Sequence, residues 1–300
     1  MSLRRALLVI NPEARGDVSV ADGARDLVAS APGWEVAMAR TEMRGHGALL
    51  AEEAAAAGTD MVLAVGGDGT VREVAAGLSG SIVALGIVPA GTGNSSYKAL
   101  FGDATWTDVV SAAVAAPTPA GRAVDLLRVD PTGELSLLGF SVGWFAQIIQ
   151  LAADEVGVEG SAKYATAALQ ALAAPTRFTA HVELDGKVLA DGDLGLLAIG
   201  GSPVRGSVFP VLPRSVMDDG RLDLIVVRAA SPEEFGEMLA LVHDEAHLDH
   251  PLVSWGQGDR VLIRSGTQLP AEIDGDLWER HLGETAVSVV PGALRVIDRV

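Results

Sequence analysis

The 300-residue chain contains no cysteine, which excludes disulfide bonds and thiolate chemistry and suits a cytoplasmic protein. Basic residues are also scarce, because 22 Lys and Arg stand against 39 Asp and Glu and give a formal net charge of −17. This charge excludes nucleic acid as a partner and opposes non-specific attraction to anionic lipid surfaces. Any contact with a membrane surface must therefore be transient, peripheral, local and apolar.

The sequence also lacks a clear membrane-spanning run. Ala6–Ile10, the first apolar stretch, is too short for the core of a signal peptide. Leu135–Ala153 has no charged residue and is almost long enough to cross a bilayer. Glycines and glutamines interrupt this segment, so we interpret it as a buried strand, Leu135–Ser141, followed by the start of a helix.

Two glycine-rich loops occupy the centre of the sequence. The apolar run Met61–Val65 ends in G-G-D-G-T (66–70), and a helical pattern starts at Val71. The apolar run Ile82–Val88 ends in P-A-G-T-G-N (89–94). Glycines at such points allow positive φ and close approach to a ligand, and free N–H groups at a helix start favour phosphate. Because ligands of open α/β sheets bind at the carboxyl ends of strands, the two loops predict a phosphate site.

The type of phosphate site can be narrowed by exclusion. No G-x-x-x-x-G-K-[ST] motif occurs, and the dinucleotide motif G-x-G-x-x-G fails because Arg72 and Ser96 stand at the third glycine. G-G-D-G-T with Glu73, followed by P-A-G-T-G-N, resembles the diacylglycerol kinase catalytic-domain family, which comprises bacterial lipid kinases and their sphingosine and ceramide kinase relatives. NAD kinases share G-G-D-G-T alone, so the resemblance depends on the pair of loops. Two plain glycine turns in an ordinary α/β domain are the alternative.

The resemblance implies ATP and Mg²⁺ as cofactors. It implies that the nucleotide is bound by Asn11, Thr41, Gly66, Gly67, Asp68, Gly69, Thr70, Glu73, Gly91, Thr92, Gly93 and Asn94. Asp68 and Asp125 are implied members of a carboxylate cluster near the metal, but the family's third Asp is Ser95 here, and Arg72 replaces a usual Asn. Glu73 lies one turn into the predicted helix, where an interaction with the helix dipole or the bracing of a loop is enough to explain a carboxylate.

A second metal site is implied by Asp218-Asp219-Gly220, which matches the family's D-D-G-x-L-D turn. There the Asp219 carboxylate and the main-chain oxygens of Val216 and Arg221 would bind a structural Mg²⁺, since oxygen ligands suit this ion. The alternative is a hairpin turn that uses Asp-Gly for its backbone conformation.

The resemblance also implies a general base. Asp274-Gly275-Asp276 matches the family's D-G-E motif with Asp at the last position, so Asp274 would accept the hydroxyl proton and Asp276 would assist. A simple Asp-Gly turn is the alternative, and Asp68 and Glu73 compete for the role of base.

Three histidines, His243, His247 and His250, have a spacing that suggests metal ligands. Asp244 follows the first of them, so the H-E-x-x-H motif is not matched. A solvated helix face is the alternative interpretation.

The order of patterns predicts two domains. A β-α rhythm over residues 1–120 predicts a parallel sheet covered by helices, and the resemblance implies that this sheet is NAD-kinase-like and forms the nucleotide-binding domain. After the linker Pro117–Gly121, short alternating runs over residues 121–300 predict an antiparallel β-rich domain, with helices at Ala162–Ala174 and Pro232–Asp244. The resemblance implies that this domain is a β-sandwich that binds the lipid substrate. The resemblance implies that the last strand can return to the first domain.

These observations predict an ATP- and Mg²⁺-dependent kinase that transfers the γ-phosphate to a lipid hydroxyl, of diacylglycerol or a related lipid. Gly139–Gln150 and Ala162–Ala174 are candidates for an apolar cleft that holds the acyl chains. Two alternatives stay open, a small-molecule kinase of the NAD type and a non-catalytic nucleotide-binding regulator, the latter motivated by Ser95 and Arg72. The sequence does not name the lipid or decide whether a homodimer forms.

Overall fold

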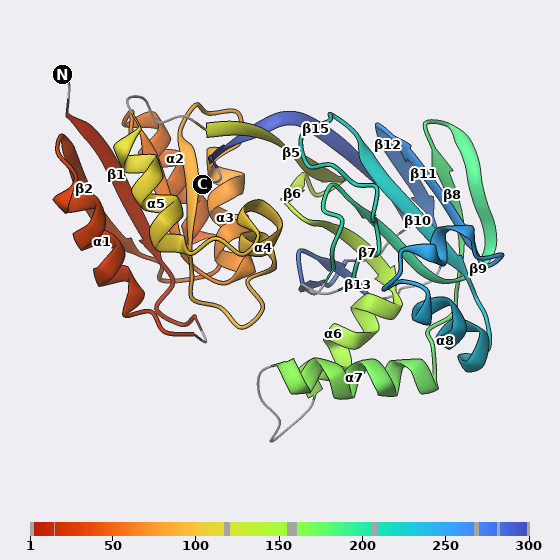
Figure 1. Ribbon diagram of the computed structural model, residues 1–300. Coiled ribbons are helices and arrows are strands. Elements are labelled where there is room, and N and C mark those ends of the chain that lie inside the picture. The colour runs from red at the N-terminus through yellow and green to blue at the C-terminus, as the bar shows by residue number, and fades with distance from the viewer. Residues whose placement is uncertain are drawn as a thin grey trace. The chain divides into compact units, whose positions relative to one another are not determined.

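The computed structural model describes residues 3–14, 16–116, 121–154, 161–205, 209–266, 270–280 and 283–298. These residues form two compact units (Figure 1). Unit 1 comprises Met1–Asp125 and Pro291–Val300, and unit 2 comprises Leu126–Val290. The predicted linker at 117–120 lies outside the described residues.

Unit 1 is a parallel sheet with helices, as predicted. The sheet order is β4-β3-β1-β2, and all three pairings are parallel. Its strands are β1 (Arg4–Ile10), β2 (Trp34–Arg40), β3 (Met61–Gly66) and β4 (Ala84–Pro89). Its helices are α1 (Val20–Ser30), α2 (His46–Ala56), α3 (Asp68–Leu78), α4 (Ser95–Phe101) and α5 (Trp106–Ala115). The end of β15 (Glu284–Ile297) pairs in parallel with β4, so this strand contributes residues to both units.

The apolar patterns of unit 1 explain its layers. Every residue of β3 is buried, as expected for a strand covered on both faces. In α3 the residues at i, i+3, i+4 and i+7 from Val71 are all buried against the sheet. This helix begins at Asp68, earlier than the pattern predicted, because the Val71 N–H donates to the Gly67 carbonyl and adds a first turn without apolar residues.

Unit 2 is mainly antiparallel β-structure, which confirms the β-sandwich-like prediction. Neighbouring strands run in the order β14-β13-β7-β9-β8-β12-β15, while β10 pairs with β9 and β11, and β5 with β6. The strands are β5 (Gly121–Asp130), whose residues up to Asp125 belong to unit 1, β6 (Glu134–Ser136), β7 (Gly139–Gly143), β8 (Phe178–Leu184), β9 (Lys187–Gly200), β10 (Leu222–Arg228), β11 (Val253–Gly258), β12 (Arg260–Arg264), β13 (Ala271–Ile273) and β14 (Asp276–Trp278). The helices are α6 (Trp144–Asp154), α7 (Ser161–Ala173), α8 (Pro232–Ala240) and the 3₁₀ turn η1 (Ala246–Asp249).

Alternate residues of the central strands of unit 2 face two different cores. On β10, Leu224 and Val226 join a core within the β-structure, whereas Ile225 and Val227 join a core with the helices. The helical core also contains Trp144 of α6, and α6, α7 and α8 supply half of its remaining buried members. Both faces of β10 are therefore buried.

Several predicted elements of unit 2 need correction. Leu135–Ser141 is not one strand, because the chain breaks at Leu137 and Leu138, whose N–H groups bond to a carboxylate instead of a neighbouring strand. The helix predicted to reach Asp244 ends at Ala240 and gives way to turns. None of the described helices is long and apolar enough to cross a membrane.

Candidate functional site

The two glycine loops lie side by side in unit 1, at the carboxyl ends of the neighbouring strands β3 and β4. Gly66 is in register with Pro89, and the two loops then approach each other closely at Gly67 and Gly91. A Cβ added to Gly91 would lie 2.4 Å from the Cα of Gly67, so a side chain at Gly91 would force the backbone to shift. The close approach, rather than a special φ angle, requires glycine here.

The positive φ that the sequence analysis allowed for the loop glycines is not observed at Gly67. Gly67 has φ −93° and ψ −172°, which is extended backbone available to any residue. Asn94 takes the left-handed conformation instead, with φ 51°, and precedes α4 as its N-cap residue. Its side chain closes the second loop, since Nδ2 donates to the Gly91 carbonyl and Oδ1 accepts from the Gly91 N–H, both at 2.9 Å. Asn is among the residues that tolerate this conformation.

Asp68 joins the two loops. Its carboxylate accepts hydrogen bonds from the N–H groups of Ser95 at 3.1 Å and Ser96 at 2.7 Å, in the first turn of α4. A carboxylate at this position accepts hydrogen bonds from N–H groups that have no partner within the helix. Its negative charge is also stabilised by the positive end of the helix dipole. Ser95 therefore meets Asp68 through its main chain, in the position where the family resemblance places a third carboxylate.

Asn11 and Thr41 lie at the same edge of the sheet, directly after β1 and β2. The Asn11 side chain donates to the Thr70 hydroxyl at 3.1 Å, and the Thr41 N–H donates to the Ile10 carbonyl at 2.8 Å. Thr70 in turn packs tightly against Gly66. The ends of four parallel strands thus bring together most of the residues predicted to bind the nucleotide.

Glu73 braces a neighbouring loop. Its carboxylate accepts from the Gly45 N–H at 2.7 Å and from the Gly47 N–H at 3.0 Å, at the start of α2. This is the bracing role that the sequence allowed, and it directs both carboxylate oxygens toward α2.

Asp125, the other predicted magnesium ligand of unit 1, is 7% exposed in strand β5. Its Oδ1 accepts from the Gly292 N–H at 2.7 Å, so the buried charge has a main-chain partner. Across the described parts of the chain, no group of three or more His, Cys, Asp or Glu residues is placed to hold a metal ion. The residues therefore do not form a ready carboxylate cage, although Mg²⁺ normally binds through one or two carboxylates, water and substrate phosphates.

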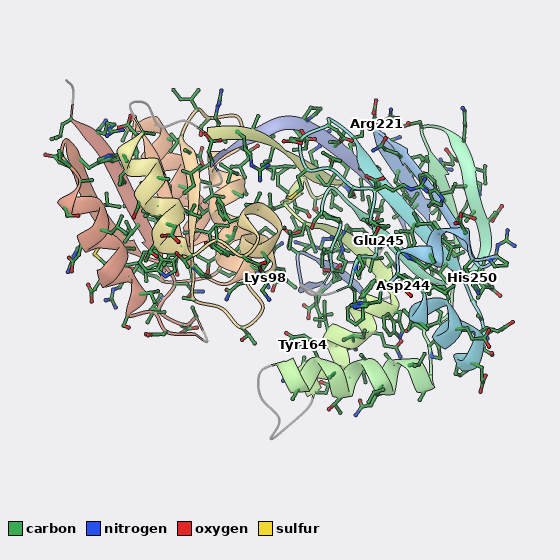
Figure 2. The ribbon with its side chains drawn as sticks, viewed as in Figure 1. Lys98, Tyr164, Arg221, Asp244, Glu245 and His250 are labelled. Carbon is green, nitrogen blue, oxygen red and sulfur yellow. The ribbon has the colours of Figure 1, made fainter. Side chains whose placement is uncertain are left out.

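The Asp218–Asp219–Gly220 segment forms a turn before β10. The Asp219 carboxylate accepts from the Arg221 N–H at 3.0 Å and from the Gln257 side chain at 3.1 Å, and Gly220 has φ 74°. Figure 2 labels Arg221, the residue directly after Gly220 in this turn. These contacts are those of an Asp-Gly turn, and the magnesium site at Val216, Asp219 and Arg221 stays a prediction.

A buried carboxylate follows this turn. Asp223 accepts from the Ser215 hydroxyl at 2.9 Å. Burial raises the pKa of Asp223, and the Ser215 hydrogen bond acts in the opposite direction.

Asp274 is deeply anchored in unit 2. It is 5% exposed and has φ 50°. Its Oδ1 accepts from the Ser136 hydroxyl at 2.6 Å and from the N–H groups of Leu138 and Gly139 at 2.8 and 2.9 Å. Its Oδ2 accepts from the Leu137 N–H at 2.8 Å. Four donors thus hold the carboxylate against the β6–β7 break, which limits its movement toward a substrate hydroxyl. Its role as general base, assisted by the half-buried Asp276, stays a prediction.

Two charged residues that the sequence analysis missed support this anchor. The Arg205 side chain is 7% exposed and donates to the carbonyls of Leu138 and Ile199, both at 2.7 Å. The Glu272 side chain accepts from the Gly275 N–H at 2.8 Å. Burial raises the pKa of Glu272 and lowers the pKa of Arg205, while the attraction between the two charges opposes both shifts. Glu272, two residues before Asp274, was a visible signal, but nothing near Arg205 in the sequence indicated its partners.

The three histidines do not form a metal centre. His247 is fully buried, and its Nε2 lies 3.0 Å from the Val211 carbonyl oxygen. His250 accepts from the Leu252 N–H at 3.3 Å, and His243 is exposed. The helix ends before this segment, so the spacing of His243 and His247 does not place them on one helix face.

Comparisons with known proteins agree with this architecture. Residues 5–129 match the diacylglycerol kinase catalytic domain, and residues 140–298 match the YegS C-terminal NAD kinase beta sandwich-like domain. A relative from Pseudomonas syringae pv. tomato, named probable lipid kinase YegS-like, is 32% identical over 99% of this chain and 94% of its own length. A diacylglycerol kinase from Bacillus subtilis is 24% identical over 94% of this chain and 93% of its own length.

A crystal structure of a diacylglycerol kinase from Bacillus anthracis has the same fold, with a TM-score of 0.72 and 18% identity over 98% of this chain and 96% of that one. The two family matches and the 32% identical relative define a kinase of the lipid kinase class. The chain belongs to the diacylglycerol kinase catalytic-domain family, with a C-terminal domain of the YegS type.

Proposed function

We propose that this chain transfers the γ-phosphate of ATP to a hydroxyl group of diacylglycerol or a related lipid, with Mg²⁺ as the metal. The observation that carries the proposal is that the two glycine loops lie side by side at the carboxyl ends of β3 and β4. Asp68 of the first loop accepts hydrogen bonds from the N–H groups of Ser95 and Ser96, which follow the second loop. Both loops lead directly into the start of a helix, and the main chain at a helix start favours anions such as the phosphates of a nucleotide. The comparisons support a lipid as the acceptor, because both named relatives are called lipid or diacylglycerol kinases.

The residues of unit 1 suggest a division of roles. The glycine pair lets the two loops lie directly against each other, so the main chain of both can form one side of the phosphate site. Asp68 fixes the start of α4, and Glu73 fixes the start of α2, so both helix ends are preorganised. A bound Mg²⁺ would offset the negative charge of the phosphates, and Asp68 is the carboxylate at the loops that could hold it.

A carboxylate must also accept the proton of the lipid hydroxyl. Asp274, assisted by Asp276, is our proposal for this step, and Asp68 is the competing candidate. The proton acceptor must lie within hydrogen-bond reach of the hydroxyl, so Asp274 would need a substrate that approaches its less occupied oxygen, Oδ2.

The proposal is tested by incubating the purified chain with labelled ATP, Mg²⁺ and a panel of diacylglycerols, ceramide, sphingosine and NAD, and identifying products by mass. We expect a phosphorylated glycerolipid, and we expect Asp68→Asn to remove most of the product. A phosphorylated NAD product would establish the small-molecule alternative. ATP binding without any product would favour the regulator, which the uncharged Ser95 at the Asp68 contact would then explain.

A further inference from the structure

Arg205 of unit 2 lies in a slot that two glycines provide. Gly139 of β7 and Gly200 of β9 are register partners, and a Cβ added to either would overlap the Arg205 guanidinium. The guanidinium donates from Nη1 to the Leu138 carbonyl and from Nη2 to the Ile199 carbonyl, both at 2.7 Å. The missing side chains of the two glycines therefore give the guanidinium its place against these strands.

One peptide group connects Arg205 to the proposed general base. The Leu138 carbonyl and the Gly139 N–H belong to the same planar peptide group. Arg205 donates to the oxygen of this group, and the N–H of the group donates to Asp274 Oδ1 at 2.9 Å. The Gly139 carbonyl also accepts from the Asp274 N–H at 3.1 Å. Because hydrogen bonds in a chain polarise one another, the guanidinium holds the peptide group that holds the carboxylate.

The charge of Arg205 is balanced by carboxylates of the same site. Glu272 is 3% exposed on β13, two residues before Asp274. Burial lowers the pKa of Arg205, and the negative charges of Glu272 and then Asp274 raise it. Apolar residues of similar volume can replace buried charges without loss of stability. The Arg205 Nε also lacks a hydrogen-bond partner among the described residues, which is a cost to the fold. A role in the chemistry explains such a residue better than packing does.

We infer that Arg205 is a positioning residue for the proposed phosphoryl transfer, because it holds the Asp274 carboxylate in one orientation through the Leu138–Gly139 peptide group. Glu272 supplies its counter-charge. This inference rests on the proposed function and on Asp274 as its base. Three of the four donors to Asp274 are main-chain N–H groups of residues 137–139, the segment that Arg205 holds. A displacement of a reacting group by about 1 Å can lower a rate by about 10²-fold.

The test compares Arg205→Met with a double variant that adds Glu272→Gln, using the full chain below the melting temperature of each variant. Arg205→Met leaves the buried Glu272 charge without its partner, so its melting temperature should fall, and the double variant should regain it. We expect kcat of both to stay about 10- to 10²-fold below wild type, with the KM for ATP changed by less than about twofold. Arg177→Met is the matched control, because Arg177 donates to the Ala230 carbonyl at 2.8 Å in the same unit. Its kcat should equal that of the wild type.

A second comparison shows whether Arg205 acts through Asp274. Adding Arg205→Met to Asp274→Asn should lower kcat by less than about twofold more, because residues that act as a unit have non-additive effects. Arg205→Lys keeps the charge but lacks the planar fork that reaches two carbonyls, so its kcat should fall by about tenfold with the melting temperature nearly kept.

Two results overturn the inference and leave the proposed function intact. One is wild-type kcat in Arg205→Lys or in the folded double variant of Arg205 and Glu272. The other is a fully additive loss when Arg205→Met is combined with Asp274→Asn. A wild type that phosphorylates no lipid instead fails the proposed function itself, and this inference fails with it.

Discussion

Asp68 in unit 1 and Asp274 in unit 2 both stand beside a glycine, and both accept main-chain N–H groups, but their surroundings differ. Asp68 is half-buried and accepts two N–H groups from the first turn of α4. Asp274 is 5% exposed and accepts three N–H groups and a hydroxyl from a break between two strands. The difference indicates that Asp68 organises a surface that a ligand can reach, whereas Asp274 also holds the fold of unit 2 together.

Replacing each carboxylate by its amide gives the largest expected effects. Asp274→Asn should lower turnover by about 10²–10⁴-fold if it is the base, with ATP affinity little changed. It should also lower the free energy of unfolding by about 2–3 kcal/mol, because an amide NH₂ cannot accept from the buried Leu137 N–H. Asp68→Asn should lower turnover by about 10²-fold or more and the free energy of unfolding by less than about 1 kcal/mol.

Turnover is measured below the melting temperature of each variant, and unfolding by denaturant. Ser136→Ala is the matched control, because it removes one donor to Asp274 and keeps the carboxylate. Its cost should be about 1 kcal/mol with turnover retained. Near wild-type turnover in folded Asp274→Asn would make Asp274 an anchor only and leave Asp68 as the base.

The glycine pair gives a second test of unit 1. Gly91→Ala places a Cβ 2.4 Å from the Gly67 Cα, so the loops must separate, and ATP affinity should fall by about tenfold or more. Gly23→Ala is the matched control, because Gly23 lies in α1, outside both loops, and its added Cβ would lie 3.7 Å from the Trp106 side chain, which is ordinary packing. Isothermal titration with ATP measures both. Equal affinities would show that the approach of the two loops is unimportant for nucleotide binding.

The sequence predicted the elements whose pattern is local. Strands β3 and β4 are continuous apolar runs, and the core face of α3 has helical spacing, so unit 1 and the meeting of its loops could be predicted from these patterns. A positive φ is not found at Gly67, because a glycine in a loop can serve either a positive φ or a close approach of two backbones, and the sequence does not say which of the two applies. The left-handed residue is Asn94, whose side chain closes the loop.

The parts that could not be predicted depend on residues far apart in sequence. Asp274 bonds to a segment more than 130 residues earlier, and this contact replaces part of a predicted strand. Arg205 has no local pattern because its partners are main-chain carbonyls of Leu138 and Ile199. β13 and β14 have three residues each, too few for a period-2 pattern to be recognised.

Asp219 is another Asp-Gly carboxylate of unit 2, and it provides a test of the predicted structural cation. If a cation binds there, a chelator should lower the melting temperature of the wild type, because a ligand of the native state stabilises it by mass action. Asp219→Ala should also lower it and remove most of the chelator response. Differential scanning fluorimetry with and without EDTA measures this. An equal response in both proteins would mean that the Arg221 N–H and Gln257 are the only partners the carboxylate needs.

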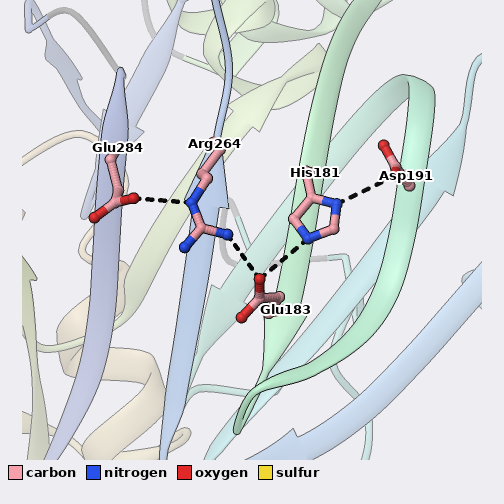
Figure 3. A network of polar contacts seen from close by, with 5 residues as sticks. All are labelled: His181, Glu183, Asp191, Arg264 and Glu284. Atoms are coloured by element: carbon pink, nitrogen blue, oxygen red, sulfur yellow. Dashed lines mark hydrogen bonds and ion pairs between the residues drawn. The ribbon is translucent and has the colours of Figure 1, made fainter.

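The smallest expected effect belongs to a partly exposed network of unit 2, which contrasts with the buried anchor at Asp274. Figure 3 shows His181 between Asp191 and Glu183, at 3.2 and 3.1 Å, and Arg264 between Glu183 and Glu284, at 2.7 and 2.8 Å. Hydrogen bonds to Asp191 and Glu183 raise the pKa of His181, and hydrogen bonds from Arg264 and then His181 lower the pKa of Glu183.

The signs of these shifts fix the pH dependence. Because the pKa of His181 is raised, its stabilisation is complete below the unfolded value near 6.5 and is lost as the pH rises through the higher folded value. His181→Gln should therefore lower the melting temperature slightly at pH 5.5 to 6 and have almost no effect at pH 8.5, since exposed ion pairs contribute little. Melting curves across this range measure the difference, with His243→Gln as an exposed control outside the network. A loss of stability that is equal at all pH values would show that the imidazole acts by packing and that its charge is irrelevant to unit 2.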